Sequence, residues 1–146
     1  MQLSKEDLIS VCPNDLQKEH KKLVDKRDRI ILEEDNIEYQ KRIAKFKSVL
    51  LQKDDINISV IKDLFQMKHE GNLLGHCVFS NGYWKKEKSL ILSARYNDEV
   101  VETIEIDLEK KRLLQARGKS NRPSKYHEII IDIVNGNIKK IISFKG

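Results

Sequence analysis

Hydrophobic residues recur at helical spacing over the N-terminal part of the chain. From Asn14 to about Gln52 there is no proline or glycine, and the apolar residues form a roughly heptad-like stripe at Leu16, Leu23, Ile30, Ile31, Ile37, Ile43, Phe46 and Leu50. This pattern predicts one long helix over residues 14–52. A helix with such a stripe packs on its own domain, on a partner protein or on a second copy of itself.

The helical pattern is interrupted at Asp54 and Asp55. We expect a second helix from about Ser59 to His69, with Gly71 as the residue that ends it. Residues 1–55 are therefore predicted to form an N-terminal helical region, and residues 56–146 the core of one compact domain.

Strand-like alternation follows in four segments separated by turns, at 76–80, 89–96, 100–107 and 112–117. Asn121 and Pro123 then indicate the start of another helix, which should end near Asn135 and Gly136. Helices, an antiparallel meander of about four strands and a C-terminal helix in this order indicate the α+β class.

The composition excludes several classes of protein. Cys12 and Cys77 belong to no C-x-x-C motif, so neither a disulfide framework nor a structural zinc site is predicted. No apolar run reaches the roughly 18 residues of a membrane span, and no signal-peptide pattern is present, so we expect a cytoplasmic protein with no membrane partner. The chain has no phosphate-loop, dinucleotide-binding or zinc-protease motif, and we expect neither a cofactor nor a metal.

The charge is positive and unevenly distributed. The 28 Lys and Arg residues exceed the 23 Asp and Glu residues, for a net charge of +5. Basic residues gather at 84–88, 110–112 and 117–125. This balance permits DNA or RNA as a partner without requiring one, because solvated turns also carry such clusters.

Side-chain alternation places polar residues from three predicted strands on one surface. If residues 97–99 and 109–111 are three-residue loops, Glu105 lies across from Gln115 and Thr103 across from Arg117, with Arg95 on the same face. Two-residue loops would reverse the faces and separate these side chains. Two arginines beside a glutamate suit a phosphate-bearing ligand, whereas a solvated face with weak cross-strand ion pairs is the alternative.

The segment from Gly118 to Pro123 leads into the predicted C-terminal helix. The start of a helix favours an anion, and Lys119 and Arg122 would add positive charge there. Asn121 suits the N-cap position of this helix, with phosphate binding as a further role.

Several of these residues also occur in a family signature. The run Glu70-Gly71-Asn72-Leu73-Leu74-Gly75-His76-Cys77-Val78, followed by Tyr83, resembles a motif of PcfJ-like proteins, which conjugative plasmids and related mobile genetic elements encode. Arg95, the triplet Thr103-Ile104-Glu105 and the run Gln115-Ala116-Arg117-Gly118-Lys119-Ser120-Asn121 resemble its later part. The resemblance covers about residues 56–135 and implies no particular biochemical activity.

Three functions remain open. The first is a nucleic-acid-associated domain of a mobile element that binds a phosphate-bearing ligand through the polar face, with Tyr83 near it. The second is an enzyme acting on phosphodiesters or nucleotides, with His76 as the acid or base and Glu105 as its partner. The third is a protein-interaction module that uses the long N-terminal helix. The sequence leaves open whether the protein is an enzyme.

Overall fold

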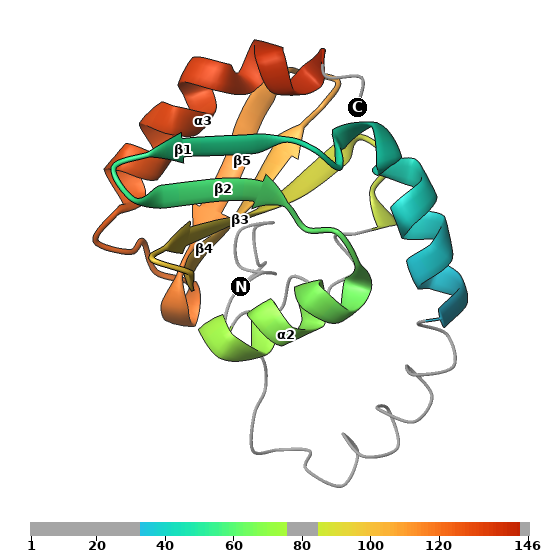
Figure 1. The fold of residues 1–146 in the computed structure, drawn as a ribbon, viewed down its shortest axis with the longest axis horizontal. Helices are drawn as coiled ribbons and strands as arrows, with labels where there is room; N and C mark the ends of the chain where they lie inside the picture. Colours follow the sequence, from blue (N-terminus) through green and yellow to red (C-terminus); the bar gives the residue numbers. More distant parts are fainter. Residues whose placement is uncertain (1–32, 76–84, 144–146) are drawn as a thin grey trace, which may run out of the picture.

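A five-stranded antiparallel sheet forms the centre of the computed structural model, which describes residues 33–75 and 85–143 (Figure 1). The strands lie side by side in sequence order: β1 (Leu50–Lys53), β2 (Ile56–Val60), β3 (Ser89–Tyr96), β4 (Glu99–Asp107) and β5 (Arg112–Arg117). The helices are residues 33–42, α2 (Leu64–Leu74) and α3 (His127–Ile142), with short 3-10 turns η3 (Ala44–Phe46) and η5 (Lys119–Asn121). The predicted α+β class is confirmed.

Two of the five strands were not predicted: β1 lies mostly in sequence expected to be helical, and the end of β2 overlaps the start of the expected second helix. The helix that ends at residue 42 does not continue to Gln52, because residues 50–60 form the β1–β2 hairpin. Asp54 and Asp55, with φ of 50° and 67°, make its two-residue turn. Three β-branched residues then alternate with Asn57 and Ser59, a period-2 pattern that places Ile56, Ile58 and Val60 in the core.

The ends of the two later helices also differ from prediction. Helix α2 begins after Asp63, whose side chain accepts a hydrogen bond from the backbone N–H of Gln66, and it continues through Gly71 to Gly75. Gly75 has φ of 69° and ends the helix in the left-handed conformation. Helix α3 continues through Gly136, because residues beyond it, such as the buried Ile141, still pack on the core.

The predicted strands at 89–96, 100–107 and 112–117 are confirmed within one or two residues. The predicted strand at 76–80 and residues 14–32 of the predicted long helix lie outside the described residues. None of the described helices is long and apolar enough to cross a membrane.

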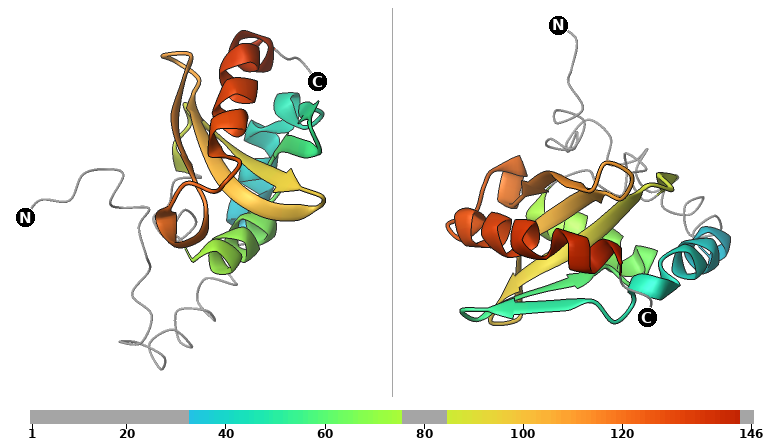
Figure 2. Two further views of the ribbon diagram at one scale, coloured as in Figure 1. Left: turned by 90° about the vertical axis from the view of Figure 1, so that its left-hand side faces the viewer. Right: turned by 90° about the horizontal axis from the view of Figure 1, so that it is seen from above.

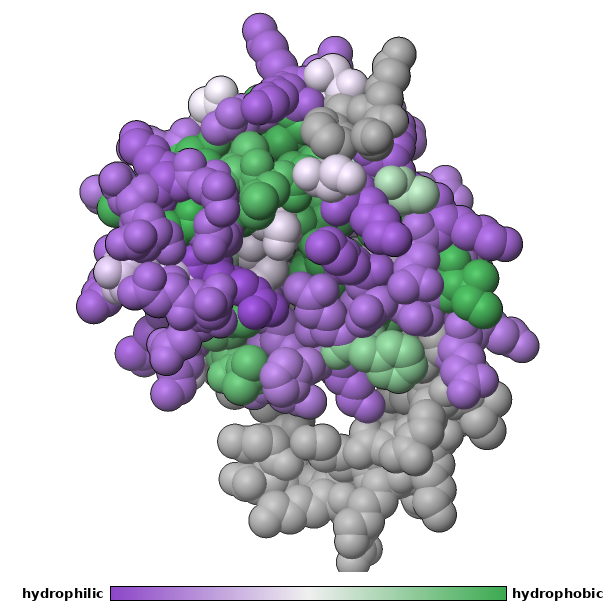
Figure 3. Space-filling view, viewed as in Figure 1, coloured by the Kyte–Doolittle hydropathy of each residue, from purple (hydrophilic) through white to green (hydrophobic). Residues whose placement is uncertain are grey.

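The sheet separates α3 from α2, which lie above and below the strands in Figure 1. The face that carries Leu92, Ala94, Ile104 and Ile106 packs against α3, which runs across the strands (Figure 2). The opposite face carries Ser93, Thr103 and Glu105 and meets α2. The surface seen in Figure 3 is mostly polar, with an apolar strip between β1 and α3 where Leu50 is exposed.

The predicted strand register is correct, although the predicted loops are wrong. Asn97 and Asp98 form a two-residue turn between β3 and β4, and residues 108–111 connect β4 to β5. Each of these even-length connections would reverse the faces of the next strand. A β-bulge in each pair, at Val101 and at Leu114, adds one unpaired residue and restores the alternation. Glu105 therefore faces Gln115, as expected.

Candidate functional site

The five polar residues that we expected on one face of the sheet do share that face. Thr103 pairs with Arg117 and Glu105 with Gln115, while Arg95 follows Ser93 by two residues on the same side of β3. This surface, which we call the polar face, is not an open wall. Helix α2 covers its middle, and Thr103, Glu105 and Gln115 are buried.

Glu70 of α2 is the residue that contacts the middle of the polar face. The Ser93 hydroxyl donates a hydrogen bond to Glu70 Oε1, and the Thr103 hydroxyl donates to Glu70 Oε2 over 2.8 Å. Burial raises the pKa of Glu70 to about 7, although the two hydroxyl bonds and the charge of Arg95 act to lower it. The helix is thus joined to β3 and β4 through one carboxyl group that titrates near neutral pH.

Glu105 is the second buried carboxylate of the polar face. Its Oε2 accepts hydrogen bonds from Ser89 Oγ at 2.8 Å and from Lys86 Nζ at 3.2 Å, and its Oε1 accepts from Gln115 Nε2 at 2.9 Å. Both oxygens are therefore occupied by neighbours in the protein. His76, the predicted catalytic partner, and Tyr83 lie outside the described residues, so the catalytic pair stays a prediction.

A third carboxylate, Glu102, lies on the other face of the sheet and holds the chain ahead of α3. Its Oε2 accepts hydrogen bonds from the backbone N–H of Ser124 at 2.8 Å and from the Ser124 hydroxyl at 2.7 Å. His127 Nδ1 lies 3.0 Å from Glu102 Oε1. These contacts fix the segment of residues 118–126, which we call the basic loop, beside the end of β4 that extends beyond β5.

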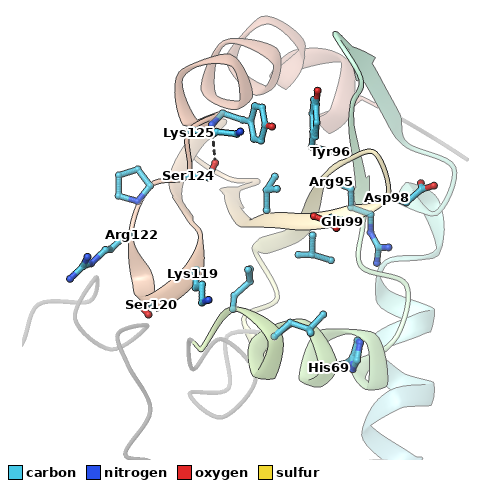
Figure 4. A pocket seen from close by; sticks show the side chains of 16 residues that line it. His69, Arg95, Tyr96, Asp98, Glu99, Lys119, Ser120, Arg122, Ser124 and Lys125 are labelled. Carbon is cyan, nitrogen blue, oxygen red and sulfur yellow. Dashed lines mark hydrogen bonds between the residues drawn. The ribbon is translucent and has the colours of Figure 1, made fainter.

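The basic loop forms one wall of a cavity of about 1130 Å³. The other walls are the C-terminal half of α2 and the β3–β4 hairpin, where β4 extends beyond the end of β5 (Figure 4). Besides the imidazole of His69, charged side chains line it on opposite walls: Arg95, Asp98, Glu99, Lys119, Arg122 and Lys125. We call this cavity the basic pocket, because it contains more cations than carboxylates.

The start of the basic loop is tightly folded. A Cβ atom on Gly118 would lie 2.7 Å from the carbonyl oxygen of Val101 and 2.9 Å from that of Arg122, so only glycine fits there without a shift. Ser120 and Asn121 both have positive φ, 56° and 64°. Asn121 is therefore part of η5 rather than the predicted N-cap of the last helix, which begins six residues later at His127.

Two aromatic rings close the upper end of the basic pocket. The rings of Tyr96 and Tyr126 are stacked, with centroids 4.3 Å apart and an interplanar angle of 16°. Lys125 Nζ lies 5.2 Å from the centre of the Tyr126 ring, a cation–π contact. The pair joins the basic loop to β3 and leaves both rings partly exposed.

The structure divides the predicted ligand-binding residues into three groups. Arg95 and Lys119 line the basic pocket, and Arg117 and Asn121 are half-buried close to it in sequence. The remaining described members are buried in hydrogen-bonded contacts of the polar face, as given above. Arg122, expected beside Lys119 at the start of the last helix, also lines the pocket. Sequence reasoning missed Lys125 as an individual residue, although it belongs to the basic cluster at 117–125. It also missed Glu70, whose only signal is its place at the start of the family motif.

The fold and the cavity define a small α+β domain with a basic pocket at one end of its sheet. The family model of the PcfJ-like proteins matches residues 1–131, and the chain belongs to this family. The match includes the N-terminal region in which we identified no motif. Neither a curated protein nor a solved structure matches the chain.

Proposed function

We propose that the protein binds single-stranded nucleic acid, with the phosphates of the strand held in the basic pocket. The observation that carries this proposal is the position of four cations around one hollow: Arg95, Lys119, Arg122 and Lys125. Within the part of the chain that the structure describes, none of them forms an ion pair. Arginine can grip a phosphate through two parallel hydrogen bonds, and lysine adds a mobile point charge.

The shape of the pocket favours a single strand over a duplex. Proteins that read duplex DNA insert a protruding helix or ribbon into a groove about 12 Å wide. Here the cations come from the walls of a hollow between α2, the β3–β4 hairpin and the basic loop. Arg122 points outward at its rim (Figure 4), so the ligand would pass the rim and enter the hollow. A flexible single strand can do this. The partly exposed rings of Tyr96 and Tyr126 at the pocket's upper end offer apolar surface for a base.

The backbone of the basic loop supports a functional role for this region. Ser120 and Asn121 hold a left-handed conformation that costs an L-residue roughly 1 kcal/mol or more. Such conformations persist where the surrounding structure imposes them, and they cluster at ligand-binding sites. In this loop they directly follow Lys119, which lines the pocket (Figure 4).

The test is the binding of a short fluorescent oligothymidylate, measured against salt concentration. For single strands the logarithm of the binding constant falls with the logarithm of salt concentration by about 0.7 for each phosphate contact. The double variant Lys119→Gln/Arg122→Gln should weaken binding and reduce this slope by about 1.4, if each cation makes one contact.

The matched control is Lys110→Gln/Lys111→Gln. It removes the same charge from exposed residues in the β4–β5 turn, at the opposite end of β4 from the pocket. We expect this variant to retain most of the affinity and the slope. Equal losses in both variants would show that general surface charge attracts the strand, and tighter binding of a duplex would contradict the choice of ligand.

A further inference from the structure

Glu70 and the basic pocket share two structural elements. Helix α2 contributes His69, Leu73 and Leu74 to the pocket, and Glu70 lies between them in sequence on the side of the helix that contacts the sheet. On strand β3, Ser93 donates a hydrogen bond to Glu70, and Arg95 lines the pocket. Because Ser93 and Arg95 are two residues apart on the same face, their backbones are about 7 Å apart. Figure 4 shows Arg95 pointing from β3 toward α2.

Among the described residues, Arg95 is the one cation whose charge affects the ionisation of Glu70. From β3 and β4 it meets the hydroxyls of Ser93 and Thr103, and the charge of Arg95 acts on it from β3. From the helix of residues 33–42 it faces the buried Tyr39, whose pKa is raised mainly by burial and slightly by the charge of Glu70. His69, on its own helix, is exposed at the pocket.

We infer that a phosphate bound in the basic pocket competes with Glu70 for the charge of Arg95, so that ligand binding is accompanied by uptake of a proton at Glu70. This inference rests on the proposed function. In the empty pocket the guanidinium favours the ionised carboxylate. A phosphate that pairs with Arg95 neutralises this charge, and the buried carboxylate then takes a proton from water or buffer. The protonated carboxyl group donates its hydrogen bond to one of the two hydroxyls that previously donated to it.

The protonation equilibrium of Glu70 makes this coupling measurable near neutral pH. Since burial places the pKa of its carboxyl group at about 7, the protonated and ionised forms have similar populations there. Binding at pH 7 can therefore take up at most about half a proton at this residue. The same linkage requires affinity for the strand to fall as the pH rises through neutrality, by about threefold to tenfold between pH 6 and pH 8.

The experiment is titration calorimetry of oligothymidylate binding at pH 7 in two buffers with different ionisation enthalpies. Neither the phosphodiesters nor thymine titrate in this range, so uptake reports on the protein. We expect wild type to take up a large part of the maximum of about half a proton for each strand bound. The Glu70→Gln variant should lose most of this uptake. Glu105→Gln, which alters a buried glutamate of the same face that does not line the pocket, is the matched control and should behave as wild type. His69→Gln separates the contribution of the exposed histidine, and we expect uptake to persist in it.

The outcomes distinguish this inference from the proposed function. Salt-dependent binding with the same proton uptake in wild type and Glu70→Gln would overturn the inference and leave the proposed function standing. An absence of binding in wild type would overturn both. If Glu70→Gln does not fold, Arg95→Gln serves instead: it should still bind through the other three cations but without uptake at Glu70, and undiminished uptake in this variant would contradict the inference.

Discussion

The pH dependence of stability at Glu70 can be worked out from its surroundings. The carboxyl group is buried beneath α2, and its pKa of about 7 in the folded protein compares with an ordinary value of 4.5. A raised carboxyl pKa means that the folded state binds the proton more tightly than the unfolded state. The stabilisation from the protonated form is fully present below pH 4.5, declines between pH 4.5 and 7, and is lost above pH 7.

The size of the effect follows from the two pKa values. Their difference corresponds to about 3 kcal/mol between acidic and alkaline pH, since one pKa unit is about 1.4 kcal/mol. Glu70→Gln removes the ionisable group and keeps the size of the side chain. The variant loses about 1 kcal/mol at acidic pH, because the amide satisfies the two hydroxyls less well. Relative to wild type it should then gain up to about 3 kcal/mol as the pH is raised to 8.

The assay is urea denaturation of both proteins at pH 5, 6, 7 and 8, with the midpoint and slope fitted at each pH. Ser93→Ala is a useful companion, because it removes one hydrogen bond to Glu70 and leaves the carboxyl group able to ionise. That variant should lose stability with rising pH at least as steeply as wild type. A constant difference between Glu70→Gln and wild type across the four pH values would refute the reasoning, as would a relative gain toward acidic pH.

Three further predictions concern stability, each measured by urea or thermal denaturation. Gly118→Ala should lower the free energy of unfolding by about 1–3 kcal/mol, because its Cβ would meet the carbonyl oxygen of Val101. Gly136→Ala, in a helix with open space around it, should raise the free energy of unfolding by up to about 1 kcal/mol. A reversed order would contradict the account of the basic loop. Ser124→Ala removes a hydrogen bond to the buried Glu102 and should lower the free energy of unfolding by about 1–3 kcal/mol. It should also weaken oligothymidylate binding, although the charge of the protein is unchanged. A loss of stability with full binding would refute the link between the position of the basic loop and binding. Tyr39→Phe leaves the buried carbonyl of residue 61 without its 2.7 Å hydrogen bond and should cost about 1–3 kcal/mol, and an unchanged midpoint would argue against that bond.

The register of the meander could be predicted from sequence because alternation of polar and apolar residues reports directly on the two faces of a strand. The connections could not. The predicted loop at residues 97–99 has one residue more than the actual turn, which consists of Asn97 and Asp98. Nothing in the identity of Val101 or Leu114 indicates a bulge. The two differences compensate, because each turn shifts the strand pairing by one residue and each bulge shifts it back.

The N-terminal strands were missed for a different reason. Residues 50–53 continue the apolar stripe of the preceding helix, so periodicity alone assigns them to it. Their strand conformation depends on pairing with β2, which is a tertiary interaction.

The candidate site was only partly visible in the sequence. Arg95 and Lys119 were selected from their strand position and the basic cluster, and both line the pocket. The polar face was expected to be open, because the packing of α2 through Glu70 cannot be read from a single segment. The basic pocket itself depends on where the basic loop lies beside β4, which Glu102 fixes from the other face of the sheet.

The central claim is that a nucleic-acid strand binds at the basic pocket, and amide chemical-shift mapping with oligothymidylate tests it most directly. We predict that the amide signals of residues 95–101 and 118–126 shift progressively with added strand, while those of the β4–β5 turn at 108–111 do not. Shifts confined to other parts of the surface, or spread equally over both ends of the sheet, would contradict the claim.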